Sequence, residues 1–105
     1  MVAEIDTRIA DIKETLNYEK ESIVSKIITE DKYKSLIGFA FDRGQSILPC
    51  KSPVDATIHV LEGQAEVMIG GQNYDIMEGE VIVMPKDKFH ALFAKTKLKL
   101  ALYKG

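Results

Sequence analysis

Residues 44–63 read GQSILPCKSPVDATIHVLEG, and residues 79–90 read GEVIVMPKDKFH. Each segment begins with a glycine and contains a run of β-branched and other apolar residues, a composition typical of strands. Gly44, Gly63 and Gly79 stand at expected turn positions, where glycine lets the chain adopt positive φ or bend sharply. The two segments therefore predict short strands that are joined by tight turns.

The chain after residue 21 continues this pattern. Apolar and β-branched runs predict strands at 23–29, 36–41, 57–61, 65–69, 74–76, 81–84, 89–93 and 98–103. Val81–Met84 is expected to be a short buried strand. Leu48–Pro53 is expected to be an irregular arm, because its two prolines do not fit a paired central strand. So many short strands, without parallel βαβ spacing, predict an antiparallel sandwich or barrel.

The spacing of the two segments resembles the two-motif signature of the cupin family. The family motifs read Gly-x5-His-x-His-x3-Glu-x6-Gly and Gly-x5-Pro-x-Gly-x2-His, and this chain follows their frame from about Phe41 to Tyr103. The resemblance implies an all-β fold, a double-stranded β-helix (an RmlC-like jelly-roll barrel), over residues 21–105. A short N-terminal helical segment, residues 1–20, is expected to precede the barrel.

Four positions of this frame hold metal in the family. Cys50, Ser52 and Ala56 stand where the first motif has His, His and Glu, whereas His90 keeps the histidine of the second motif. The resemblance therefore implies a ligand pocket formed by His90, Cys50, Ser52 and Ala56, with a degenerate metal site.

A metal site built on other residues is the weaker alternative. Thiolate and imidazole are both ligands for transition metals, so Cys50 and His90 can supply two arms for Zn, Ni or Fe. The third arm would come from His59, Asp55 or Gln45. Strand alternation places His59, three residues after Ala56, on the opposite face from Ala56, which argues against His59.

The N-terminal segment has a helical period. Ile5, Ile9, Ile12 and Leu16 recur at i, i+4, i+7 and i+11, and Asn17 is a plausible helix end. We expect this helix to lie as a lid on the barrel's own surface. A dimer-contact element is the alternative.

Composition excludes several classes of protein. A chain of 105 residues with a formal net charge of −2 and mixed charge signs indicates one domain without a basic surface for nucleic acid. The longest apolar run, Val81–Met84, is too short to cross a bilayer, and the first residues do not resemble a signal peptide. We therefore expect a cytoplasmic protein without a membrane partner.

Two hypotheses for function remain open. The first is a binding protein that holds a small molecule in the barrel near His90. The second is a metal-dependent enzyme of dioxygenase, isomerase or decarboxylase type with an atypical Cys50/His90 site. The small core and the family habit further predict a homodimer with a largely apolar interface.

Overall fold

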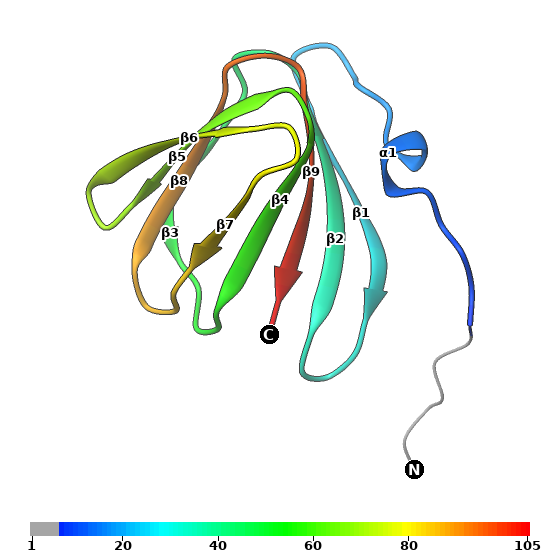
Figure 1. Cartoon of the computed structure of the whole chain (residues 1–105), viewed down its shortest axis with the longest axis horizontal. Coiled ribbons are helices and arrows are strands. Elements are labelled where there is room, and N and C mark those ends of the chain that lie inside the picture. Colours follow the sequence, from blue (N-terminus) through cyan, green and yellow to red (C-terminus); the bar gives the residue numbers. More distant parts are fainter. Residues whose placement is uncertain (1–6) are drawn as a thin grey trace.

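The computed structural model describes residues 7–105 and shows an antiparallel β protein with one short helix (Figure 1). The elements of the described chain are α1 (Ile12–Thr15), β1 (Ile23–Glu30), β2 (Ser35–Phe41), β3 (Ser46–Lys51), β4 (Ala56–Glu62), β5 (Gln64–Ile69), β6 (Gln72–Met77), β7 (Val81–Met84), β8 (Phe89–Ala94) and β9 (Leu98–Lys104). The predicted all-β class and the short N-terminal helix are confirmed.

The strands form two sheets, with the orders β1-β2-β9-β4-β7 and β3-β8-β5-β6. Strands that follow one another often lie in different sheets, since β4 pairs with β7 and β9 whereas β5 pairs with β6 and β8. The chain thus winds around a common interior, as in a jelly roll. In Figure 1 the five-stranded sheet runs from β7 at the centre to β1 at the right, and the strands of the four-stranded sheet lie to its left.

The core lies between the two sheets, because alternation along each strand directs every second side chain inward. On β4, Ile58 and Val60 are buried, whereas the intervening His59 is only half-buried. Most of the buried cluster comes from the strands that meet across the interior. Its members are Phe41, Ala56, Ile58, Val60, Ala65, Val67, Ile76, Met84, Leu92, Ala94, Leu98 and Leu100.

Gly63 is the corner at which the chain leaves the five-stranded sheet and enters the four-stranded one. Its φ is +90°, and a Cβ atom built on it would lie 2.1 Å from the carbonyl oxygen of Lys97. Gly44 and Gly79 also have positive φ, at +86° and +88°, so the predicted turn function of all three glycines is confirmed.

The N-terminal helix is much shorter than the prediction of residues 5–16. α1 spans Ile12–Thr15, Ile9 is fully exposed, and Ile5 lies outside the described residues. A short isolated helix is marginal in water, so α1 persists only where its side chains pack on the barrel. Leu16 is 1% exposed and lies against Gly38 of β2, as expected for a lid.

No helix within residues 7–105 is long and apolar enough to cross a membrane.

A polar cluster fastens the N-terminal segment to the barrel. The Tyr18 hydroxyl donates a hydrogen bond to Glu62, and the Lys13 ammonium lies 3.3 Å from the same carboxylate. Lys99 donates to the backbone carbonyl of Lys13 at 2.8 Å. Burial and the bond to Glu62 raise the pKa of Tyr18, and the Tyr18 hydroxyl lowers the pKa of Glu62. The lid is therefore held by polar contacts as well as by Leu16.

Two predictions about strands are wrong. The proline-rich arm contains β3, which pairs with β8 at the edge of its sheet and accommodates Pro49 where the register shifts between Ile47 and Cys50. β7 is not buried: Val81 and Val83 are 58% and 61% exposed, because β7 lies at a sheet edge with one face outward.

Candidate functional site

A cavity of about 70 Å³ lies between the sheets, near the end where β4 begins and β9 ends. Eleven of its fourteen lining residues are apolar, and the other three are Ser52, His90 and Lys104. The apolar walls are Phe39, Phe41, Ile47, Ala56, Ile58, Val67, Met84, Ala91, Leu92, Leu100 and Leu102. The cavity is thus an apolar chamber with a few polar groups, the usual composition of a small-molecule site.

Three of the four residues predicted for the pocket line this cavity. Ala56 and Ser52 are buried, and His90 is half-buried on β8. The Ser52 hydroxyl donates to the carbonyl of Val54 at 2.9 Å and accepts from its N–H at 3.3 Å. Ser52 therefore shapes the loop before β4, and its hydroxyl is already engaged.

Cys50 lies beside His90 but outside the lining of the cavity. The two residues are direct cross-strand partners on β3 and β8, and Cys50 Sγ is 3.4 Å from His90 Nε2. Cys50 is exposed, so the pair forms a thiol–imidazole contact at the rim of the barrel. The frame position of Cys50 thus brings it to His90 without directing it into the chamber.

The candidate third ligands lie elsewhere. His59 pairs with Val81 and Ala101 and does not line the cavity, which confirms that it faces away from Ala56. Asp55 accepts a hydrogen bond from the Lys86 N–H at 2.9 Å and borders a separate groove. Gln45 also lies outside the cavity lining.

The side chains at the four frame positions are too few to hold a metal ion without ligands from another molecule. Ala56 has no donor atom and the Ser52 hydroxyl is engaged, which leaves Cys50 and His90. Protein zinc sites use at least three such ligands. Within residues 7–105 no three His, Cys, Asp or Glu side chains are grouped so that they could share an ion.

Lys104 is the polar lining residue that the sequence analysis did not predict. Its place follows from alternation along β9, where Leu98, Leu100 and Leu102 face inward and Lys104 continues the series. Ala56 is its cross-strand partner, so the two residues meet at the same end of the barrel. A lysine usually indicates a solvent-exposed position, so the sequence alone does not indicate that Lys104 continues the inward-facing series of β9.

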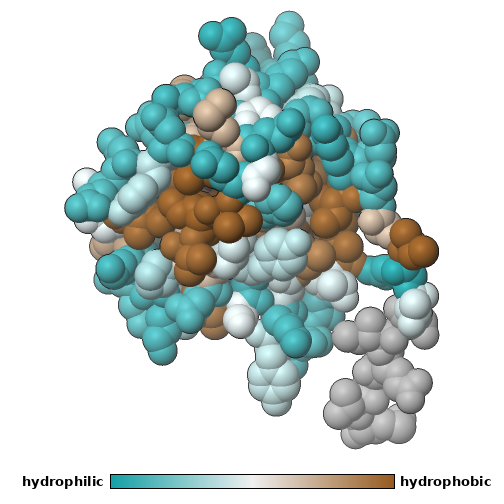
Figure 2. Space-filling model, in the orientation of Figure 1, coloured by the Kyte–Doolittle hydropathy of each residue, from teal (hydrophilic) through white to brown (hydrophobic). Residues whose placement is uncertain are grey.

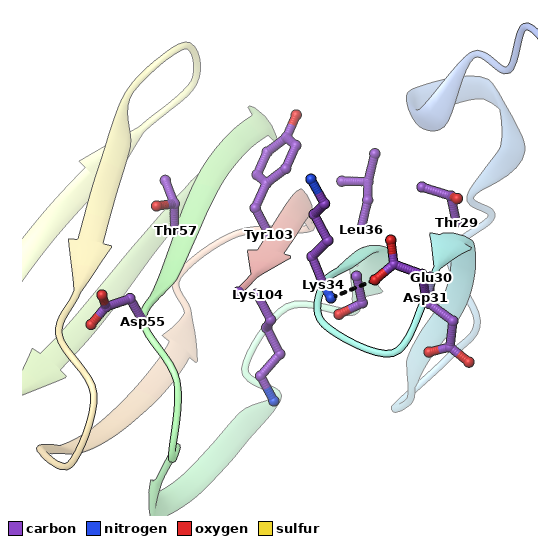
Figure 3. A pocket seen from close by; sticks show the side chains of 11 residues that line it. Thr29, Glu30, Asp31, Lys34, Leu36, Asp55, Thr57, Tyr103 and Lys104 are labelled. Carbon is purple, nitrogen blue, oxygen red and sulfur yellow. Dashed lines mark hydrogen bonds between the residues drawn. The ribbon is translucent and has the colours of Figure 1, made fainter. Parts of the chain in front are cut away.

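A groove of about 430 Å³ adjoins this end of the barrel (Figure 3). It is bordered by Thr29, Glu30, Asp31, Lys34, Ser35, Leu36, Asp55, Thr57, Tyr103, Lys104 and Gly105. Lys104 borders both the groove and the cavity, and in Figure 3 its side chain extends away from Lys34 and the Tyr103 ring. The Lys104 side chain therefore stands between the chamber and the open surface.

Comparison with known proteins identifies the family. The family model described as "Cupin domain" matches residues 39–103, more than half of the chain. The chain belongs to the cupin family. The match agrees with the frame of the two glycine-led segments and with the jelly roll.

Solved structures of other proteins share the fold of this cupin. A conserved protein of unknown function from Streptococcus pyogenes is 30% identical, with a TM-score of 0.87 over 92% of this chain and 85% of that one. A cupin 2 conserved barrel domain protein from Leptotrichia buccalis is also 30% identical, with a TM-score of 0.84 over 88% of this chain and 45% of that one.

More distant structures show the fold alone. KdgF from a Halomonas species is 22% identical, with a TM-score of 0.76 over 93% of this chain and 94% of that one. No curated protein matches the chain. The relatives therefore identify the barrel and leave the ligand to be argued from this cupin's own residues.

Proposed function

We propose that this cupin binds a small organic molecule in the chamber beside His90. The observation that carries the proposal is the chamber itself, with eleven apolar walls and polar groups gathered at one end. Apolar walls supply affinity through burial, and a few polar groups fix the orientation of a ligand.

Ligand entry can be followed at a methionine. Met84 is buried and lines the chamber, whereas Met77 is exposed on β6. Protein with ¹³C-labelled methionine methyl groups should show a saturable shift of the Met84 signal when 1-butanol or butyrate is added. Met77 should stay unchanged as the internal control. No Met84 shift with either probe at millimolar concentration would overturn the binding function.

A metal-dependent enzyme is the second candidate, and the 3.4 Å contact between Cys50 and His90 is the observation that favours it. Two soft donors side by side are the start of a site for Zn, Ni or Fe. Metal analysis of protein purified without chelator separates the candidates. One equivalent of bound metal would favour the enzymatic candidate over the binding one.

His90→Ala is expected to leave the fold intact, with a loss of about 1 kcal/mol in unfolding free energy. His90 is half-buried at the end of the barrel, so its removal opens little new void. Val60→Ala should cost about 2 kcal/mol, because Val60 is completely buried in the core. Urea unfolding of both variants makes the comparison. A larger loss for His90→Ala than for Val60→Ala would identify His90 as a structural residue.

The outer face of the five-stranded sheet supports the homodimer as the assembly. Leu36, Tyr103, Thr57 and Val83 are successive cross-strand partners on β2, β9, β4 and β7, and none of them is charged. Val83 is 61% exposed, and Figure 2 shows hydrophobic surface over β7 and its neighbours. In a chain with 29% charged residues, this row of four uncharged side chains is a surface that a second copy can cover without electrostatic repulsion.

The area needed is modest. A stable interface buries about 800 Å² on each partner, roughly one ninth of the 7106 Å² that the chain exposes. We therefore infer that two copies associate through this face, with Val83 in the interface.

Val83→Lys is expected to convert the dimer to a monomer, because it places two charges in an apolar interface. Light scattering coupled to size-exclusion chromatography measures the mass across the micromolar range. Leu48→Lys is the matched control, since Leu48 is 79% exposed on the edge strand of the other sheet and should leave the dimer intact. A monomeric wild-type chain at all concentrations would contradict the assembly.

A cytoplasmic location stays a prediction. It is supported by Cys50, which is a free and exposed thiol, because reduced cysteines are typical of the cytosol.

A further inference from the structure

The polar groups of the chamber favour an anionic ligand. Among its fourteen lining residues, all in the described part of the chain, Lys104 carries a positive charge and none is acidic. The Ser52 hydroxyl is engaged by Val54, and His90 Nε2 lies 3.4 Å from Cys50 Sγ, so Lys104 and the other ring nitrogen of His90 are the polar groups left for a ligand.

The Lys104 ammonium is not neutralised by the nearby acids. Three ion pairs occur within residues 7–105, and none of them involves Lys104. Asp55, which borders the same groove, accepts the Lys86 backbone N–H at 2.9 Å. Asp31 accepts two backbone N–H groups, and these bonds lower its pKa. Both carboxylates are thus held by backbone donors rather than by Lys104.

His90 and Lys104 come from opposite walls. His90 lies on β8 of the four-stranded sheet, and Lys104 lies at the end of β9 in the five-stranded sheet. Both residues line the chamber, so a ligand there has an imidazole from one wall and a lysine from the other. A carboxylate accepts hydrogen bonds from both kinds of donor, and such charge-assisted bonds are stronger than neutral ones.

The size of the chamber limits the hydrocarbon part of the ligand. Its volume of about 70 Å³ is roughly half that of the 150 Å³ apolar cavity that holds benzene. A chain of about three or four carbon atoms therefore fits, with a polar head at the open end.

We propose that the chamber selects a short-chain aliphatic carboxylate, with its hydrocarbon tail among the apolar walls and its carboxylate held by Lys104 and His90. This inference rests on the proposed binding function and adds the chemical class of the ligand.

The test compares butyrate with 1-butanol and butyramide, which share its tail and lack its charge. Dissociation constants come from titrating the Met84 methyl signal in the full chain. Butyrate is expected to bind at least about tenfold more tightly than either neutral probe, as expected for a hydrogen bond to a charged group. Added salt should weaken butyrate binding and leave 1-butanol binding unchanged, because salt screens charge interactions.

Variants assign the effect to Lys104. Lys104→Met keeps an unbranched side chain one atom shorter and removes the charge, and it should weaken butyrate about tenfold while 1-butanol binding stays the same. Lys26→Met is the matched control, because Lys26 is an exposed lysine of the same sheet that borders neither the chamber nor the groove. It should leave both affinities unchanged.

The outcomes separate this inference from the function on which it rests. Equal affinities for butyrate and the neutral probes, or unchanged butyrate binding in Lys104→Met, would overturn the carboxylate assignment and leave the binding function in place. The absence of a Met84 response to every probe would overturn the binding function itself.

Discussion

Gly63→Ala is expected to lower the free energy of unfolding by about 4 kcal/mol, a large part of the stability of a small domain. Two effects combine at this corner. The φ of +90° is unfavourable for any residue with a Cβ atom, and the added Cβ would lie 2.1 Å from the Lys97 carbonyl oxygen. That oxygen belongs to the backbone, so the clash is relieved only by moving the chain that leads into β9.

The same displacement disturbs a hydrogen bond. The Thr96 hydroxyl, which would lie 2.6 Å from the new Cβ atom, accepts the backbone N–H of Gln64 at 3.0 Å. Gln64 begins β5, so the link between the two sheets would loosen at the point where the chain crosses. Urea unfolding followed by far-ultraviolet circular dichroism measures the loss.

Gly79→Ala is the matched control. Gly79 has a φ of +88°, and an added Cβ atom would have no neighbour within 4 Å. It should therefore show only the conformational effect, about 1 kcal/mol. If Gly63→Ala and Gly79→Ala lose the same stability, then the close approach to Lys97 is not what requires glycine at the corner.

The turns and alternating faces of the barrel could be predicted because they depend on local chemistry. Gly44, Gly63 and Gly79 mark bends that only small residues make easily, and all three have positive φ. Counting along β4 separated Ala56, which lines the chamber, from His59, which faces the opposite way. The two-residue period of a strand is thus enough to predict which face of β4 each of these side chains occupies.

The errors arise where a partner element decides the structure. The apolar stripe of the N-terminal segment predicted a helix from Ile5 to Leu16, but within residues 7–105 its helical structure is confined to Ile12–Thr15, next to Leu16, which packs on Gly38. Val81 and Val83 suggested a buried strand, whereas the order of the sheet places β7 at an edge. Helix length and edge position depend on contacts between distant segments, which composition does not reveal.

Contacts between distant segments also limited the prediction of the site. Of the four frame positions, Ser52, Ala56 and His90 line one chamber, whereas Cys50 follows a register shift and lies at the rim. Lys104 is far from Ala56 in the sequence. The two residues are neighbours only because β9 pairs with β4, and the sequence alone does not reveal this pairing.

The triple change Cys50→His, Ser52→His and Ala56→Glu is expected to create a binding site for a divalent transition metal. Ser52, Ala56 and His90 line one chamber, and Cys50 is the cross-strand partner of His90, so the new side chains start from adjacent backbone positions. Three imidazoles and a carboxylate meet the ligand number and chemistry that Zn or Ni requires.

Without metal, this variant should be less stable than the natural chain. It loses both hydrogen bonds between Ser52 and Val54, and it places a carboxylate where the buried Ala56 has apolar neighbours. Metal reverses the balance, because a ligand that binds only the folded state stabilises it by about 2.7 kcal/mol at one hundred times its dissociation constant. For a domain of this size, that corresponds to a rise of roughly 10 to 20 °C in melting temperature.

Thermal unfolding with and without excess Ni measures this rise, and two controls define its source. The natural chain should change little, because Cys50 and His90 provide two donors and Ala56 none. Adding His90→Ala to the triple variant should remove most of the gain, since it deletes the ligand from the facing sheet. If the triple variant folds but its melting temperature is the same with and without Ni, then the side chains at the four frame positions do not point toward one common site. The metal site would then be missing from this chain because of the geometry of its barrel as well as the identity of its side chains.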